Sequence, residues 1–225
     1  LCADDGQASA HKNLGVVLWR QGHFDRAAEH LTEALRIYGQ IDDVLGQAEA
    51  LGNLGLVHER LGRLDVALEH HRQALTLFEH VGHRLGEAYA LNDLGTVHLQ
   101  LGQPAKAVQE LQQALERFRQ IDQRAGEAEA LNGLGRALHA DGAFDEAVAR
   151  HGDALAVATE IGERYEQARA HTGIAAVRES VGDLDQARRH WEIALAMYRS
   201  LGVPDADAVR ARLSALDADH EKVGS

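Results

Sequence analysis

The chain has 225 residues, of which 45% are hydrophobic but only 4% are aromatic, and its net charge is −12. Abundant alanine and leucine suit helices, because these side chains lose little rotamer freedom there, whereas a β-sandwich needs more aromatic and β-branched residues. The acidic balance argues against a nucleic-acid surface, which requires clustered lysine and arginine. We therefore expect an all-α protein with no direct nucleic-acid partner.

The hydrophobic runs, the single cysteine and the two ends of the sequence indicate where the protein is found and how the chain originated. No apolar run approaches the roughly 20 residues of a membrane span and no signal peptide is visible, so we expect a cytoplasmic protein with no membrane partner. The single cysteine, Cys2, excludes an internal disulfide framework. The start at Leu1, the only methionine at Met197 and the final Gly224-Ser225 predict an excised piece of a longer protein.

A forty-residue repeat runs through the sequence. Each unit carries a Leu-Gly pair (Ile-Ala in the fifth), a glycine seven residues after that pair, and alanines five and twelve residues further on. The later glycines are Gly22, Gly62, Gly102, Gly142 and Gly182, and the first alanines are Ala27, Ala67, Ala107, Ala147 and Ala187. A fixed period of this size is the signature of repeat architectures, so we predict a stack of small units.

Each unit is predicted to form two helices, because its apolar residues recur on one helical face and a glycine separates the two periodic runs. In chain order, the helices are expected at 8–21, 24–40, 45–61, 64–80, 85–101, 104–120, 125–141, 144–160, 165–181, 184–200 and about 204–220. The corresponding division is a linker or disordered start at 1–7, five units at 8–42, 43–82, 83–122, 123–162 and 163–203, a capping helix at 204–221 and a tail at 222–225. In the capping helix, Val209, Leu213 and Leu216 are predicted to cover the last unit.

This pattern resembles the tetratricopeptide repeat over residues 8 to 201. The unit is forty residues long where the usual repeat has about 34, and leucines replace the usual tryptophan at positions 51, 91 and 131. The resemblance implies a right-handed α-solenoid of five helix-turn-helix units with a C-terminal capping helix.

The segments between units narrow the resemblance. The runs GHRLGEAYALNDLG (82–95) and DQRAGEAEALNGLG (122–135) are similar to a run in actinobacterial AfsR-type regulators and related STAND signalling NTPases. This similarity implies the sensor or scaffold part of a bacterial transcriptional or signalling regulator, with an upstream NTPase or DNA-binding module of the same chain as a further partner. Forty-residue units also occur in the Pins/LGN adaptors, but the "RxGEA" run and the excess of arginine over lysine favour the bacterial family.

In tetratricopeptide arrays the first helices of successive units line a concave groove, and alignment on the Leu-Gly pair gives its candidate residues. They are Lys12, Asn13, Trp19, Arg20, Glu49, Asn53, Leu56, Arg60, Tyr89, Asn92, Asp93, Thr96, Asn132 and Arg136. Asparagine offers an extended backbone both a donor and an acceptor, and the two aromatic residues would hold an apolar side chain. The predicted function is a non-enzymatic module that binds a protein or peptide segment in this groove.

One subclass of these domains grips a C-terminal carboxylate with a Lys/Asn/Asn/Lys/Arg clamp. Here only Lys12 and Asn53 match, and Asp93 at a third position would repel a carboxylate. We therefore reject that interpretation.

The fourteen histidines do not form a metal motif. His58 and His98 share a repeat position with Leu18 and Leu138, which indicates a packing role, and His70 and His71 point about 100° apart on a helix. We interpret His58 and His71 as interhelical packing residues and His70 as a surface residue. No phosphate-binding loop or catalytic triad is visible, so we expect no catalytic residue, cofactor or metal.

Two alternatives stay open. The N-terminal end has no cap comparable to the last helix, so the chain could be a self-association scaffold that forms a homodimer. The groove could also hold a small ligand and act as a sensor. The sequence does not name the partner or the signal.

Overall fold

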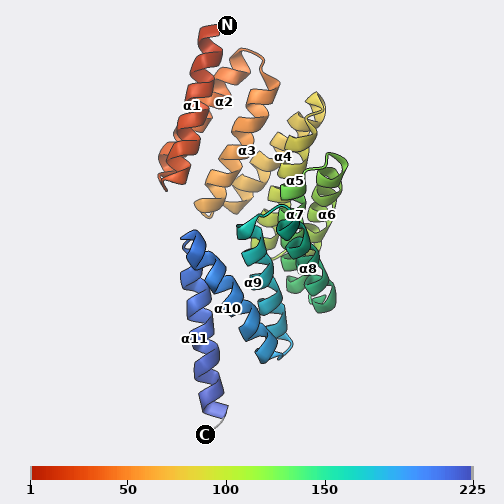
Figure 1. The fold of residues 1–225 in the computed structure, drawn as a ribbon. Coiled ribbons are helices and arrows are strands. Elements are labelled where there is room, and N and C mark those ends of the chain that lie inside the picture. Colours follow the sequence, from red (N-terminus) through yellow and green to blue (C-terminus); the bar gives the residue numbers. More distant parts are fainter. Residues whose placement is uncertain (1, 224–225) are drawn as a thin grey trace. The chain divides into compact units, whose positions relative to one another are not determined.

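The computed structural model describes residues 2–223, and in that part the chain is all helical with no strand (Figure 1). The helices are α1 (Cys2–Arg20), α2 (Phe24–Gln40), α3 (Val44–Arg60), α4 (Leu64–Val81), α5 (Arg84–Gln100), α6 (Pro104–Gln120), α7 (Arg124–Ala140), α8 (Phe144–Glu160), α9 (Arg164–Ser180), α10 (Leu184–Leu201) and α11 (Asp205–Val223). They divide into two compact units, Leu1–Ile121 and Asp122–Ser225. None of the helices in the described part combines the length and apolar character that crossing a membrane needs.

The bounds of α2 to α10 agree with the predicted ranges to within one residue at each end. The structure differs at the start, where α1 begins at Cys2 instead of residue 8, so the expected linker and its cysteine are helical. Asp4 and Asp5 lie in the first turn of α1, where carboxylates interact favourably with the positive end of the helix dipole. At the other end, α11 includes 222–223 of the predicted tail, and residues 224–225 lie outside the described part.

The turn inside each repeat requires its glycine. Gly62 has a φ of +69°, and the N–H of Arg63 then donates to the carbonyl of His58 at 2.9 Å, which closes the end of α3. The equivalent glycines in the other repeats also have positive φ, a conformation that other residues adopt only with strain. Between repeats, Asp42 and Asp122 adopt the same left-handed conformation, which aspartate tolerates better than most residues.

Small framework residues let the helices approach one another. A Cβ added to Gly55 would lie 2.4 Å from the ring of His71, and a Cβ added to Gly95 would lie 2.5 Å from the side chain of Leu111. The first alanine of each second helix is fully buried. These positions repeat because the same helix pair is built five times.

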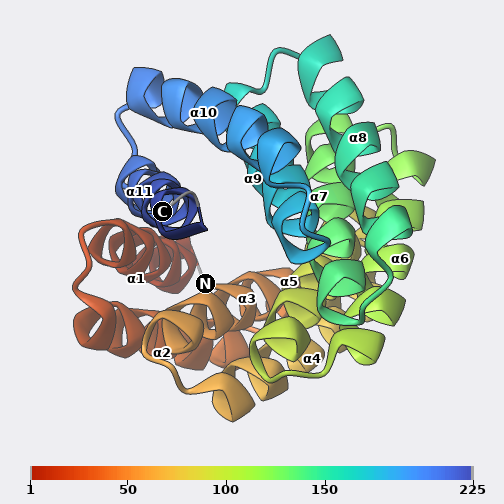
Figure 2. The same ribbon diagram turned by 90° about the horizontal axis from the view of Figure 1, so that it is seen from below.

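Successive first helices touch each other: α1 contacts α3, α3 contacts α5, and α7 contacts α9. Within each unit, the second helices pack against the first helices that flank them. In the first unit, α2 and α4 lie on the outer side of α1 and α3 (Figure 2). We call the surface formed by α1, α3 and α5 in one unit, and by α7 and α9 in the other, the first-helix face of that unit. The predicted groove residues all lie on these first helices.

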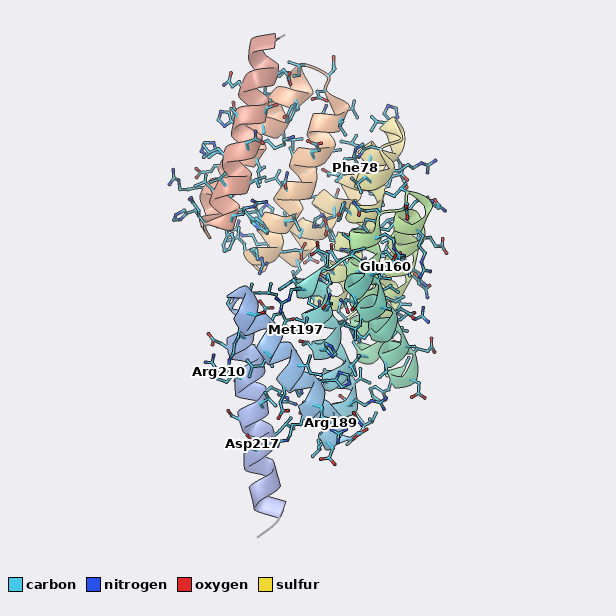
Figure 3. The ribbon with its side chains drawn as sticks, in the orientation of Figure 1. Phe78, Glu160, Arg189, Met197, Arg210 and Asp217 are labelled. Carbon is cyan, nitrogen blue, oxygen red and sulfur yellow. The ribbon has the colours of Figure 1, made fainter. Side chains whose placement is uncertain are left out.

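The helix α11 covers the apolar side of α10. As predicted, Val209 and Leu216 are buried and Leu213 is partly buried, in a cluster with Trp191 and Tyr198 of α10. The side chain of Arg210 extends from α11 away from α10, as Figure 3 shows. The helix therefore has one apolar and one polar side, as a cap requires.

Candidate functional site

In the first unit, polar contacts join the three first helices. Lys12 of α1 forms an ion pair with Glu49 of α3, and its Nζ lies 5.9 Å from the centre of the Tyr38 ring. Further along, the amide of Gln100 in α5 donates to Glu59 of α3 at 3.2 Å. Burial opposes the charge of Lys12, but the contacts with Glu49 outweigh it and raise the pKa of the amine. These residues form a polar strip across α1, α3 and α5.

Aromatic residues accompany this strip. The guanidinium of Arg60 lies 6.0 Å from the ring of Trp19, and Leu56 and Asn53 lie beside the same ring around a small cavity. Tyr89 on α5 is about one-third exposed and packs edge-on against Phe118, with ring centres 5.0 Å apart. Both aromatic candidates are therefore anchored on one side and accessible on the other.

Most of the predicted groove residues are accessible. Asn13, Arg20, Arg60, Tyr89 and Arg136 are exposed, and Lys12, Trp19, Glu49, Asn53, Leu56, Asp93 and Thr96 are partly exposed. Asn53 and Thr96 use their side chains within their own helices, donating to the carbonyls of Glu49 and Asn92. The expectation differs from the structure at Asn92 and Asn132, which are buried and cannot present an amide to a partner.

The burial of Asn132 has a specific cause in the second unit. Its Nδ2 donates to the backbone carbonyl and to the carboxylate of Glu166, at 3.0 and 2.9 Å, and its Oδ1 accepts from Nδ1 of His151 at 3.1 Å. All three contacts hold α7, α8 and α9 together. Asn132 is therefore a packing residue, which its amide chemistry alone could not reveal.

Arg136 on α7 is an exposed cation of this unit. Its neighbour Arg169 is paired with Glu166 at 2.9 Å, but within the described residues Arg136 has no ion-pair partner. Partial desolvation between the helices and the charge of Arg169 lower the pKa of the Arg136 guanidinium. Tyr165 and Tyr198 lie close by. The arrangement can accept a carboxylate or a carbonyl oxygen.

A cavity of about 430 Å³ lies in the same unit, between α9 and α11. Its lining is Thr172, Ala176, Glu179 and Ser180 from α9, Trp191 and Tyr198 from α10, Asp205, Ala208, Val209 and Arg212 from α11, and His139 from α7. Sequence reasoning placed no site here, because the cavity depends on how α11 meets α9.

The histidines make contacts that the repeat alignment only partly indicated. His71 is fully buried, as expected of a packing residue, but His70 is half-buried and stacks on His58 with ring centres 5.2 Å apart, where a surface residue was expected. Two further histidine pairs occupy the same positions in their repeats: His11 with His30 in the first repeat, and His171 with His190 in the fifth. Each pair joins the two helices of its repeat, with Nδ1 atoms 2.9 Å apart. The shared repeat positions of these pairs were the signal that could have found them.

Comparison with known proteins agrees with this architecture. Tetratricopeptide repeat models match residues 8–41, 46–120 and 92–161. A comparison with curated protein sequences found no match. Three solved structures illustrate the similarity of the fold, and all are below 25% sequence identity, so the likeness concerns the fold alone.

BtubC from P. vanneervenii is 22% identical with a TM-score of 0.75, over 88% of this chain and 82% of that chain. Aspartyl phosphate phosphatase F from Bacillus subtilis is 16% identical with a TM-score of 0.79, over 97% of this chain but only 58% of that chain. A Rap protein complexed with competence and sporulation factor is 15% identical with a TM-score of 0.72, over 98% and 73% of the two chains. Together with the helix pairs, the turn glycines and the small framework residues, the three family matches mean that the chain belongs to the tetratricopeptide repeat proteins.

Proposed function

We propose that the chain is a non-enzymatic module that binds a segment of another protein, or a peptide, along its first-helix faces. The observation that carries this proposal is Arg136, an exposed guanidinium on α7 without an ion-pair partner among the described residues. The neighbouring cation Arg169 is paired with Glu166. A guanidinium left without a counter-ion in an acidic protein keeps its full capacity to bind a partner's carboxylate or carbonyl group.

The similarity to known proteins supports a recognition role. The related Rap structure was determined as a complex with competence and sporulation factor, so this fold can hold a partner in at least one protein. The runs at 82–95 and 122–135 support a place in a cytoplasmic bacterial regulator, as its sensor or scaffold part. In that role the module would report binding to an upstream NTPase or DNA-binding module of the same chain.

A selection of random peptides displayed on phage tests the proposal. We expect the chain to enrich a peptide consensus, and we expect Arg136→Ala to weaken the binding of the enriched peptides by about tenfold, the loss of roughly 1.4 kcal/mol. Arg189→Ala is the matched control, because Arg189 is an exposed arginine on α10, outside the first-helix face (Figure 3). The proposal fails if no peptide is enriched, or if both variants bind as the parent chain does.

A second candidate function, self-association, is favoured by the exposed side of α1. Leu14 and Val17 are 43% and 47% exposed, whereas the equivalent residues of the later repeats, such as Leu54 and Val57, are at most 7% exposed. Leu54 and Val57 are buried in a cluster with Ala27 and Leu31 of the preceding second helix, α2. We propose that a second copy of the chain covers Leu14 and Val17 in a homodimer. Sedimentation velocity tests this: the dimer should be lost in the double variant Leu14→Gln, Val17→Gln, and a monomer at every concentration would exclude it.

A further inference from the structure

The cap helix α11 meets its two neighbours in different ways. Its apolar side chains, among them Val209 and Leu216, pack on α10. Polar contacts bridge it to α9 at two places: Tyr165 donates to Asp205 at 3.3 Å, and Arg212 donates to Glu179 at 2.9 Å. The cavity lies between these two bridges. Polar contacts, and not interlocked apolar side chains, therefore define its two ends.

The cavity has an aromatic floor and small walls. Trp191 and Tyr198 of α10 form the floor, and both are more than nine-tenths buried in the helix bundle. Ala176 of α9 and Ala208 of α11 contribute small side chains to its lining. A volume of about 430 Å³ falls within the range of small-ligand pockets, roughly 300 to 1,000 Å³.

The repeat alignment explains why the space occurs here. The position of Ala176 holds Val16, Leu56, Thr96 and Arg136 in the other repeats, so the fifth repeat has the smallest side chain of the five. The position of Trp191 holds leucine or histidine in the other repeats, so the fifth repeat has the largest. This exchange of volume leaves a slot above a flat indole ring.

Polar groups stand at both ends of the slot. The hydroxyls of Thr172 and Tyr198 lie 3.4 Å apart at one end. At the other end, Glu179 accepts from the indole N–H of Trp191 at 3.3 Å and pairs with Arg212, next to the contact of His139 with Ser180 at 2.8 Å. A ligand with a flat apolar body and one hydrogen-bonding substituent would match both the floor and the ends.

We propose that this cavity binds a planar aromatic group that carries a hydroxyl or N–H, either as a free small molecule or as a tyrosine or tryptophan side chain of a bound peptide. The ring packs against Trp191 and Tyr198, and its substituent reaches the polar groups at one end. The peptide form rests on the proposed function above, and the small-molecule form does not.

The direct test uses p-cresol as the probe and the two tryptophan indole N–H signals as reporters in ¹H–¹⁵N spectra of the whole chain. We expect p-cresol to shift the signal of Trp191 and to leave that of Trp19, which lies in the other unit. We expect 4-methylcyclohexanol, a non-planar molecule of similar size, to bind more weakly. Equal binding of the two probes, or no selective shift of the Trp191 signal, would overturn the proposal.

Variants of the alanine walls locate the site. Ala208→Leu should reduce p-cresol binding by about tenfold, because the added carbons occupy the space of the ring. Ala176→Leu, on α9, should reduce p-cresol binding in the same way. Two variants on different helices show that the loss does not come from a folding defect in one of them. Ala215→Leu on the exposed side of α11 is the control and should bind p-cresol as the parent chain does. Unchanged binding in both wall variants would contradict the assignment.

The peptide selection separates this inference from the proposed function. Enriched peptides should carry an aromatic residue. When the Ala208→Leu variant is used as the target of the selection, the preference for an aromatic residue should disappear. If p-cresol binds and no peptide is enriched, the proposed function fails and the cavity assignment stands. If peptides are enriched without an aromatic residue and p-cresol does not bind, the cavity assignment fails and the proposed function stands.

Discussion

At the scale of single residues, two histidines at one repeat position have opposite electrostatic environments. Burial disfavours the charged form of both. For His71, the hydrogen bond with Glu59 at 3.0 Å and the charge of Asp93 outweigh burial and raise its pKa. For His151, burial and the charges of Arg169 and Arg136 lower the pKa to about 3, and its Nε2 has no hydrogen-bond partner.

These shifts predict opposite pH dependences. The pKa of His151 is lower in the folded chain than the ordinary 6.5, so its contribution to stability is complete above that pH and is lost as the pH falls towards 3. Between pH 6.5 and 4.5 the loss should be about 2 to 3 kcal/mol, and His151→Leu should remove it, as urea unfolding at several pH values can measure. The idea is wrong if the parent chain and the variant lose stability in parallel.

His71 should act in the other direction. Its folded pKa is raised, so its contribution is complete below pH 6.5 and is lost as the pH rises through the folded pKa. His71→Leu should therefore flatten the alkaline side of the stability profile. Leucine is the residue that the first and third repeats have at this position, which makes it the conservative replacement.

The ring of His151 also sets a steric limit. It lies between Gly135 and Gly173, and a Cβ on Gly173 would lie 2.1 Å from the imidazole. Because the ring cannot move away from both helices, Gly173→Ala should cost about 1 to 3 kcal/mol in thermal unfolding. Gly152→Ala, next to the histidine but with no atom within 4 Å of the added Cβ, should be stabilising by up to about 1 kcal/mol. Equal effects of the two substitutions would contradict this account.

At the scale of helices, α11 is held by apolar contacts with α10, by an ion pair of Asp217 with Arg188 of α10, and by two polar bridges to α9. Val209 is buried against α10, and a charge there would have no partner in the apolar cluster. Val209→Asp should therefore abolish the hydrogen-exchange protection of α11, with α1 to α6 unchanged. Ala215→Asp on the exposed side is the control. Retained protection of α11 in Val209→Asp would show that the bridges alone hold the cap.

At the scale of the whole molecule, stability should be distributed along the chain. Within each of the two compact units, every helix contacts its neighbours in sequence, so a defect should stay local. Leu54→Ala removes a buried framework leucine at a cost of about 2 to 5 kcal/mol and should speed hydrogen exchange mainly in α2 to α4. The equivalent Leu134→Ala should act on α7 and α8. Uniform acceleration over all helices in either variant would refute local coupling.

The forty-residue period by itself determined the helices, the turns and the buried framework. Those features depend on residues that recur in each unit and contact only adjacent helices, so one alignment predicts them all. The glycine of each turn and the alanine of each second helix were identified in this way, and nine of the helix ranges agree with the structure to within one residue.

The tertiary structure alone decided which of the variable residues remain available to a partner. Asn132 and Arg136 lie one helical turn apart. The side chain of Asn132 is hydrogen-bonded to His151 and Glu166, whereas Arg136 has no ion-pair partner in the described part of the chain. The cavity beside α11 likewise depends on residues from four helices, each unremarkable in sequence. Accessibility, pKa and cavity volume arise from side chains that meet across repeats at positions that the period leaves free, so no single repeat encodes them.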